Sequence, residues 1–184
     1  AGNRPLNEAE VQEIKQNYAD LRKRARVSPT GMASDPLPTQ SALRVTPQER
    51  EMAYEFRWQA GGTALTRTYK DIMLVAESND TAADFARRKI QLRVSDPKVA
   101  EKLTPRDIHI GTKRLCLDTE YFETFNRDNI NLIDLRSDPI LQINQKGIQT
   151  KENHFDLDII VFATGYDAMT GPLLNMNITG KQNL

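Results

Sequence analysis

The residues best suited to chemistry are two adjacent cations, Lys113 and Arg114, which follow Gly111. They stand in a predicted loop between a helical part and a strand-rich part of the chain, where they could meet a phosphate or another anion. A solvated basic pair at the surface is the alternative interpretation. Cys116 lies beside these cations, but no clear base accompanies it, so we interpret it as a small core residue and not as a nucleophile.

A second group of candidate residues closes a predicted buried strand. Residues 159–163 form a continuous apolar run of β-branched and aromatic side chains, which is typical of a strand that is covered on both faces. Thr164 and Gly165 follow at once, with Asp167 close behind. A glycine in this place is typical of a tight turn, or of close backbone approach to a ligand at the edge of an open α/β sheet. Any buried strand that ends in a turn would give the same pattern.

The composition excludes several classes of partner. Lysine and arginine together number 25, as do aspartate and glutamate, so there is no global basic field to favour nucleic acid or an anionic membrane. With one cysteine and two histidines, an internal disulfide and a cysteine-built zinc site are excluded. The chain shows no signal peptide and no run of ~20 apolar residues that could span a membrane. We therefore expect a soluble, cytoplasmic protein.

The part before residue 108 is predicted to be helical. Asn7 and Glu10 form a capping-box pattern at the start of one amphipathic helix, whose apolar face is built by Val11, Ile14, Tyr18 and Leu21. Residues 27–45 contain three prolines and a glycine, which excludes regular structure over most of this range. Loops of this length are often functional, for example as lids or pocket walls.

Thr46, Pro47 and Glu49 predict the start of a second long helix, which Gly61 and Gly62 end. This helix carries the aromatic side chains of Tyr54, Phe56 and Trp58. We interpret them as core residues, and the alternative is that they form the wall of an apolar substrate channel.

Two further helices are expected before the composition changes. One begins near Asn79 or Asp80 and carries an apolar side made of Ala82, Phe85, Ala86, Ile90 and Val94. Asp96 and Pro97 begin a shorter one, which ends near Leu103.

The remaining sequence is typical of short strands. Residues 130–135, 140–143 and 147–150 are strand-like, and the last two are predicted to form a hairpin. Asp118 or Thr119 is expected to cap a short helix ahead of them. Helices followed by a small antiparallel element and a buried strand indicate the α/β fold class.

Taken in order, two stretches resemble the corresponding region of type I Baeyer-Villiger monooxygenases, the family of cyclohexanone and phenylacetone monooxygenases. They are GTKRLCLDTEYFETFNRDNINLIDLRSDPI, at 111–140, and DIIVFATGYDAMTG, at 158–171. The part from AGNRPLNEAEVQEIKQNY through LTPRD is similar to the helical insertion of that family. The resemblance implies a flavoprotein that converts a ketone to an ester or lactone with FAD, NADPH and dioxygen, through a peroxyflavin.

The resemblance also implies roles for the candidate residues. Arg114 matches a mobile catalytic arginine, whose guanidinium stays charged and can stabilise anionic intermediates. Lys113 matches a lysine that helps to hold the 2′-phosphate of NADP, and both cations thus count as cofactor-binding. Thr164, Gly165 and Asp167 match the ATG-type segment that crosses back toward the flavin domain, and they also count as cofactor-binding, through a positional and not a chemical role.

The sequence contains no Gly-x-Gly-x-x-Gly fingerprint, so the pyrophosphate-binding turns for FAD and NADP are missing from it. We therefore expect an internal fragment that lacks half of each nucleotide-binding domain and is inactive alone. Residues 1–107 would be the helical insertion, 108–163 the returning half of the Rossmann-like NADP domain, and 164–184 a linker and the start of the returning FAD segment. The alternatives are a flavin-dependent N- or S-monooxygenase, and a truncated, inactive helical binding module.

Overall fold

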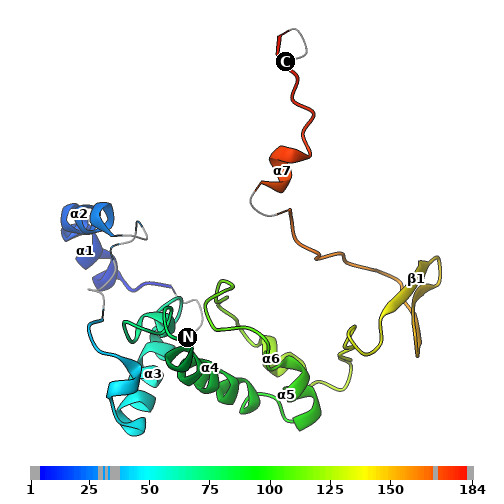
Figure 1. Ribbon diagram of the computed structural model, residues 1–184, viewed down its shortest axis with the longest axis horizontal. Coiled ribbons are helices and arrows are strands. Elements are labelled where there is room, and N and C mark those ends of the chain that lie inside the picture. The colour runs from blue at the N-terminus through cyan, green and yellow to red at the C-terminus, as the bar shows by residue number, and fades with distance from the viewer. Residues whose placement is uncertain (1–4, 29–30, 32, 34–37, 168–169, 182–184) are drawn as a thin grey trace. The chain divides into compact units, whose positions relative to one another are not determined.

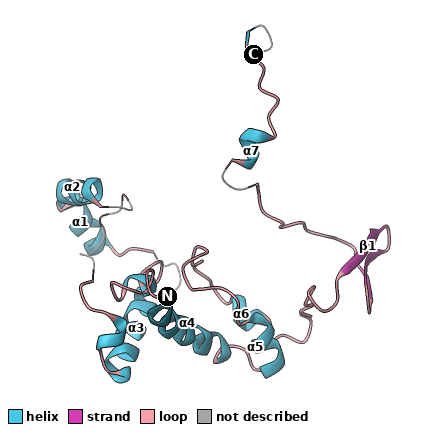
Figure 2. Ribbon diagram, in the orientation of Figure 1, coloured by secondary structure: helices cyan, strands magenta, loops and turns pink. Residues whose placement is uncertain are grey.

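The structure, a computed structural model, divides into two units, residues 1–132 and residues 133–184. Figure 2 shows that the first unit is helical and that the strands lie in the second. The fold is therefore a helix-rich α/β arrangement with a small sheet, as predicted. The residues that the structure describes are 5–28, 31, 33, 38–167 and 170–181. Within these ranges, none of the helices combines the length and apolar content that crossing a membrane requires, and no cluster of side chains suited to a metal ion is present.

The first helical stretch begins where predicted but is divided in two (Figure 1). Helix α1 (Glu8–Gln16) has the expected capping box, in which Asn7 Oδ1 accepts the Glu10 N–H at 2.9 Å and Glu10 Oε2 accepts the Asn7 N–H at 2.8 Å. Asn17, with φ −95° and ψ 7°, interrupts the expected single helix, and α2 (Tyr18–Val27) follows. No side chain of α1 or α2 is fully buried.

The end of the 27–45 segment is ordered against the core of the first unit. Ser41 precedes the 3-10 helix η1 (Ala42–Arg44), and its Oγ donates to Asp71 Oδ2 at 2.5 Å. The Ala42 N–H donates to Asp71 Oδ1 at 2.9 Å. Residues 29, 30, 32 and 34–37 lie outside the described part, so a lid or pocket wall here stays a prediction.

Helix α3 (Pro47–Ala60) has both predicted ends, with a capping box at Thr46 and a positive φ of 76° at Gly61. Its aromatic side chains separate by face, because residues four apart share a helix face and residues two apart do not. Tyr54 is 1% exposed and Trp58 packs on the core, whereas Phe56 is 69% exposed. The core interpretation is confirmed for Tyr54 and Trp58 and is wrong for Phe56.

Helix α4 (Ala76–Gln91) packs against α3 and begins earlier than predicted. No side chain caps its first turn, and Asn79 lies inside it with a buried amide. Phe85 is 1% exposed, and its ring lies 5.5 Å from that of Tyr54 and 5.8 Å from that of Trp58, measured between centroids. The 3-10 helix η2 (Leu65–Arg67) also contributes to this core.

We expect Tyr54→Phe to lower the free energy of unfolding by about 0.5–1.5 kcal/mol. The Tyr54 hydroxyl is 2.7 Å from Thr81 Oγ1, and the substitution removes this hydrogen bond without opening a cavity. Urea denaturation measures the change. Tyr18→Phe is the control, because Tyr18 is 58% exposed and its loss of a hydroxyl should change nothing. An equal effect of both substitutions would contradict the expectation.

Two short helices complete the first unit. In α5 (Pro97–Leu103), Asp96 Oδ1 accepts the N–H of Lys98 at 2.7 Å, which confirms the predicted cap. In α6 (Tyr121–Thr124), Asp118 Oδ1 accepts the N–H of Tyr121 at 3.3 Å, while Glu120 takes a left-handed conformation with φ 59°.

The predicted hairpin is confirmed, and a third strand joins it. β1 (Ile140–Asn144) pairs antiparallel with β2 (Gly147–Thr150), and β2 pairs antiparallel with β3 (His154–Asp156). The order is β1-β2-β3. Asp138 supports the sheet, because its carboxylate accepts hydrogen bonds from Thr150 Oγ1 at 2.8 Å and from the Glu152 N–H at 2.8 Å.

Two predicted strands are wrong. Residues 130–135 and 159–163 form no strand, and the short helix α7 (Gly171–Leu174) follows later in the chain. Ile159, Val161 and Phe162 are 80%, 81% and 68% exposed, so this run is not buried either. A strand needs backbone partners. The only strands among the described residues are β1, β2 and β3, which pair with one another and not with this run.

Candidate functional site

Lys113 and Arg114 lie on an exposed loop that borders a cavity of about 710 Å³ within the first unit. One wall is α4, and the other is the segment 105–122 that connects α5 to α6. The lining is mainly apolar, with Ala83, Ala86, Ile90, Ile108, Ile110, Leu115 and Leu117. The other charged residues of the lining, Arg87 and Asp118, are paired with Asp84 and Arg93.

The segment before the loop is attached to α4 by hydrogen bonds. Asn79 Nδ2 donates to the carbonyl groups of Ile110 and Ile72, both at 2.9 Å, and the Ile110 N–H donates to Asn79 Oδ1 at 3.0 Å. Arg87 Nε donates to the Pro105 carbonyl at 2.9 Å. The buried Asn79 amide thus fixes the chain immediately before the loop.

Gly111 is required at the entry to the loop. Its φ is +92°, which is unfavourable for any residue with a side chain. A Cβ here would lie 2.6 Å from Met73 Sδ and 3.3 Å from Thr66 Cγ2. The glycine therefore allows the positive φ and leaves room for the side chain of Met73.

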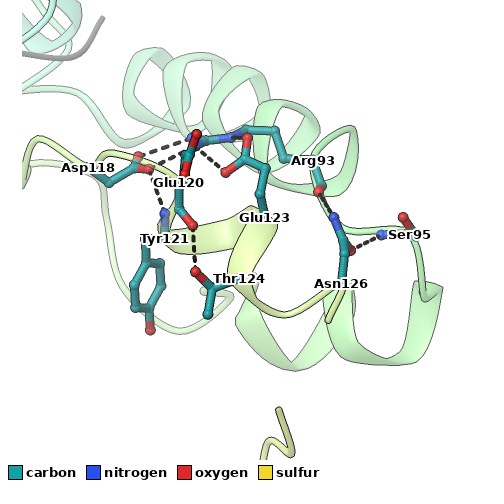
Figure 3. A network of polar contacts seen from close by, with 8 residues as sticks. All are labelled: Arg93, Ser95, Asp118, Glu120, Tyr121, Glu123, Thr124 and Asn126. Carbon is teal, nitrogen blue, oxygen red and sulfur yellow. Dashed lines mark hydrogen bonds and ion pairs between the residues drawn. The ribbon is translucent and has the colours of Figure 1, made fainter. Parts of the chain in front are cut away.

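The chain after the loop is attached to α4 by Arg93, which follows the end of the helix. Figure 3 shows its guanidinium between two carboxylates. Nη1 and Nη2 donate to Asp118 at 3.0 and 2.7 Å, and Nε and Nη2 donate to Glu123 at 2.5 and 2.6 Å. The guanidinium also lies 5.2 Å from the centre of the Phe122 ring. Both contacts are bidentate, so they fix direction as well as distance.

This network carries a pH-dependent part of the stability. Hydrogen bonds from Arg93 lower the pKa of Asp118 and that of Glu123. A carboxyl group whose pKa is lower in the folded state than in the unfolded state stabilises the fold at pH values above its unfolded-state pKa, which is near about 4. This contribution is lost as the pH falls through the folded-state pKa.

We expect Arg93→Gln to lower the melting temperature at neutral pH, and we expect the difference from the wild type to shrink below about pH 4. The reason is that protonated carboxyl groups no longer gain from the guanidinium. Melting temperatures of both proteins across the acid range test this. A difference that stays constant into strong acid would refute the assigned contacts.

The side chains of Lys113 and Arg114 contrast with Arg93. Both residues are exposed, and within the described part of the chain neither side chain makes an ion pair or hydrogen bond. An exposed cation without an internal partner can bind an external anion without first breaking a contact. The structure thus brings the two predicted cations together on one loop.

The other predicted site residues belong to the second unit. Thr164, Gly165 and Asp167 are exposed and lie in the segment between β3 and α7. Gly165 has φ +86°, but no hydrogen-bonded turn forms at residues 161–167, and Asp167 Oδ2 accepts a hydrogen bond from Asn175 Nδ2 at 2.7 Å. The positional role of these three residues stays a prediction.

Two aspects of the site were not anticipated from the sequence. Cys116 is exposed and lines the cavity, so its interpretation as a core residue is wrong, because the loop lies on the surface of the unit. Arg93 and Asn79 were not recognised, since each contacts residues at least 25 positions away and neither belongs to a motif.

The sequence is similar to known proteins over nearly the whole length of this chain. No family model matches the sequence. It is 39% identical over 186 residues to a Baeyer-Villiger monooxygenase of Pseudooceanicola batsensis and 37% identical over 186 residues to cyclohexanone 1,2-monooxygenase of an Acinetobacter species. It is 33% identical over 184 residues to a phenazine N-monooxygenase of Lysobacter antibioticus. These alignments cover 98%, 100% and 98% of the chain but 33%, 34% and 34% of the relatives, so the chain spans about a third of their length.

Solved structures show the same relationship. A steroid monooxygenase bound to NADP has a TM-score of 0.91 and 46% identity, and the alignment covers 100% of this chain and 35% of that one. The protein OTEMO in complex with FAD and NADP has a TM-score of 0.92 and 36% identity, with 100% and 34% covered.

Proposed function

Because this chain belongs to the Baeyer-Villiger monooxygenases, about a third of whose length it spans, we propose that it supplies the cationic loop of an FAD- and NADPH-dependent enzyme that converts ketones to esters or lactones with dioxygen. The observation that carries the proposal is the pair Lys113 and Arg114, which is exposed beside an apolar cavity and has no side-chain partner among the described residues. This arrangement suits a reaction in which an uncharged substrate acquires negative charge in a water-poor site.

The residues present fit one part of one cofactor, the 2′-phosphate of NADPH. Lys113 and Arg114 offer donors for a phosphate, as the 2′-phosphate of NADPH requires. The sequence has no Gly-x-Gly-x-x-Gly turn, so other residues would hold the pyrophosphates of FAD and NADPH. Gly165, with its positive φ, would place the backbone near the flavin domain with Thr164 and Asp167. When bound, the flavin supplies activated dioxygen.

In this function the residues of the chain would bind the coenzyme and stabilise the negative charge that develops during the reaction. Arg114 would hold a permanent positive charge against the negative charge that develops on the ketone oxygen, because a guanidinium does not deprotonate at working pH. Lys113 would bind the 2′-phosphate as a point charge. The cavity of about 710 Å³ is within the range of roughly 300–1,000 Å³ found for small-molecule sites, and its apolar walls would exclude water.

The proposal also assigns the parts of the chain. Residues 1–107 would form a helical insertion and residues 108–163 the returning half of a Rossmann-like NADP domain. Residues 164–184 would connect to the FAD domain. The exposed apolar run at 159–163 supports this assignment, because such a run is normally covered by neighbouring strands and helices.

The test is product analysis with the full-length protein, NADPH and a cyclic ketone. We expect a lactone, with one NADPH and one dioxygen consumed for each product. No lactone from a range of cyclic and linear ketones would refute the proposed activity.

A flavin-dependent N-oxygenase is the second candidate, and it is favoured by the similarity to a phenazine N-monooxygenase over the whole chain. The same assay with a heteroaromatic amine distinguishes the two. Formation of an N-oxide without any lactone would favour this candidate.

A further inference from the structure

The loop that carries Lys113 and Arg114 is attached at both ends to α4 or to the residues that directly follow it. Asn79, near the start of α4, holds Ile110, and Arg93, just after its end, holds Asp118. At 1.5 Å per residue these two attachment points are about 20 Å apart along the helix. Figure 1 shows the chain between α5 and α6 turning away from α4 and returning to it.

Between these attachments, the loop makes only local hydrogen bonds within the described part of the chain. The N–H and Oγ1 of Thr112 donate to the His109 carbonyl at 3.3 and 2.8 Å, and Cys116 Sγ donates to the Arg114 carbonyl at 3.7 Å. No other hydrogen bond of residues 111–117 occurs within the described part of the chain. The position of the two cations therefore depends on where the ends of the loop are fixed.

We infer that Arg93 and Asp118 form a positioning pair, which holds the loop so that Lys113 and Arg114 reach their ligands. The inference rests on the proposed function of those two cations. Asp118 lines the cavity and ends the loop, whereas Arg93 is not among the lining residues and acts through Asp118. The bidentate contact, at 2.7 and 3.0 Å, sets the direction in which the loop returns to the helix. A group positioned from a rigid element is held more accurately than one on a free loop.

Glu123 provides a matched control. It accepts two hydrogen bonds from the same guanidinium, but it belongs to α6 and not to the loop (Figure 3). Helix α6 has a second attachment, because Asn126 Nδ2 donates to the Arg93 carbonyl at 2.8 Å and Asn126 Oδ1 accepts the Ser95 N–H at 2.7 Å. Loss of the Glu123 carboxylate should therefore leave the loop in place, whereas loss of the Asp118 carboxylate should release it.

The first experiment compares Asp118→Asn with Glu123→Gln in the full-length protein by native trypsin cleavage after Lys113 and Arg114, with fragments identified by mass. We expect cleavage to be about fivefold faster or more in Asp118→Asn, because the loss of one ordinary polar contact shifts a local opening equilibrium by that factor. Glu123→Gln should be cleaved at the wild-type rate. Equal rates in the two variants would overturn the inference.

The second experiment asks whether Asp118 acts through Arg114. We expect Asp118→Asn to lower kcat about tenfold in the wild-type background and to have no further effect in Arg114→Ala. Glu123→Gln should leave kcat unchanged in both. An equal loss in both backgrounds would show that Asp118 has only a general structural role. If the wild-type protein oxygenates neither substrate class, the proposed function fails, and the trypsin comparison alone decides whether the pair holds the loop.

Discussion

Arg114→Ala in the full-length protein is expected to lower kcat for ketone oxygenation by about 100-fold or more. The structure places this guanidinium beside an apolar cavity with no side-chain partner among the described residues, so its charge is available to a bound anion. Once bound substrate and coenzyme exclude water from the cavity, a fixed charge there would contribute more than it would in water. Steady-state rates at saturating ketone and NADPH measure the effect.

Two variants sharpen this test. Arg127→Ala removes another exposed arginine whose side chain has no partner within the described residues, and it should leave kcat unchanged. Arg114→Lys keeps the charge but loses the planar fork of donors, so an intermediate rate is expected. Lactone formation near the wild-type rate in Arg114→Ala would remove this residue from the mechanism.

Lys113→Ala is expected to reduce the preference for NADPH over NADH by about tenfold to a hundredfold. A hydrogen bond to a charged group contributes about 1.5–3 kcal/mol, and each 1.4 kcal/mol corresponds to a factor of ten in binding. The change should raise the KM for NADPH and leave the KM for NADH nearly unaltered, because only NADPH carries the 2′-phosphate. Initial rates with each coenzyme give the ratio.

The control for this prediction is Lys98→Ala, which removes an exposed lysine of α5. It should not change the coenzyme preference. Equal increases of both KM values in Lys113→Ala would mean that the lysine binds a part common to the two coenzymes, and the 2′-phosphate assignment would then be wrong.

Local patterns in the sequence were sufficient to predict several helix ends. The caps at Asn7, Thr46 and Asp96 were predicted correctly, as was the end of α3 at Gly61. Each of these signals involves residues only a few positions apart, so their geometry follows from the backbone itself. The hairpin of β1 and β2 is likewise local. The cation pair and its loop were also predicted from the residues themselves, and the family resemblance added only the roles of the two side chains.

Interactions between distant residues could not be inferred in this way. The run at 159–163 has the composition of a buried strand, but composition does not provide the neighbours that a strand must pair with. Phe56 and Cys116 are apolar by type, yet their exposure depends on which elements pack nearby.

The cationic loop likewise combines features that the sequence shows with contacts that only the tertiary structure shows. The identity and adjacency of Lys113 and Arg114 are evident from the printed residues, and so is the glycine that precedes them. That Arg93 holds Asp118, and that Asn79 holds Ile110, becomes visible only after α4 has packed against a segment 25 or more residues away. Chain connectivity fixes the order of these residues, but the free energy of packing α4 in three dimensions sets the distances among them.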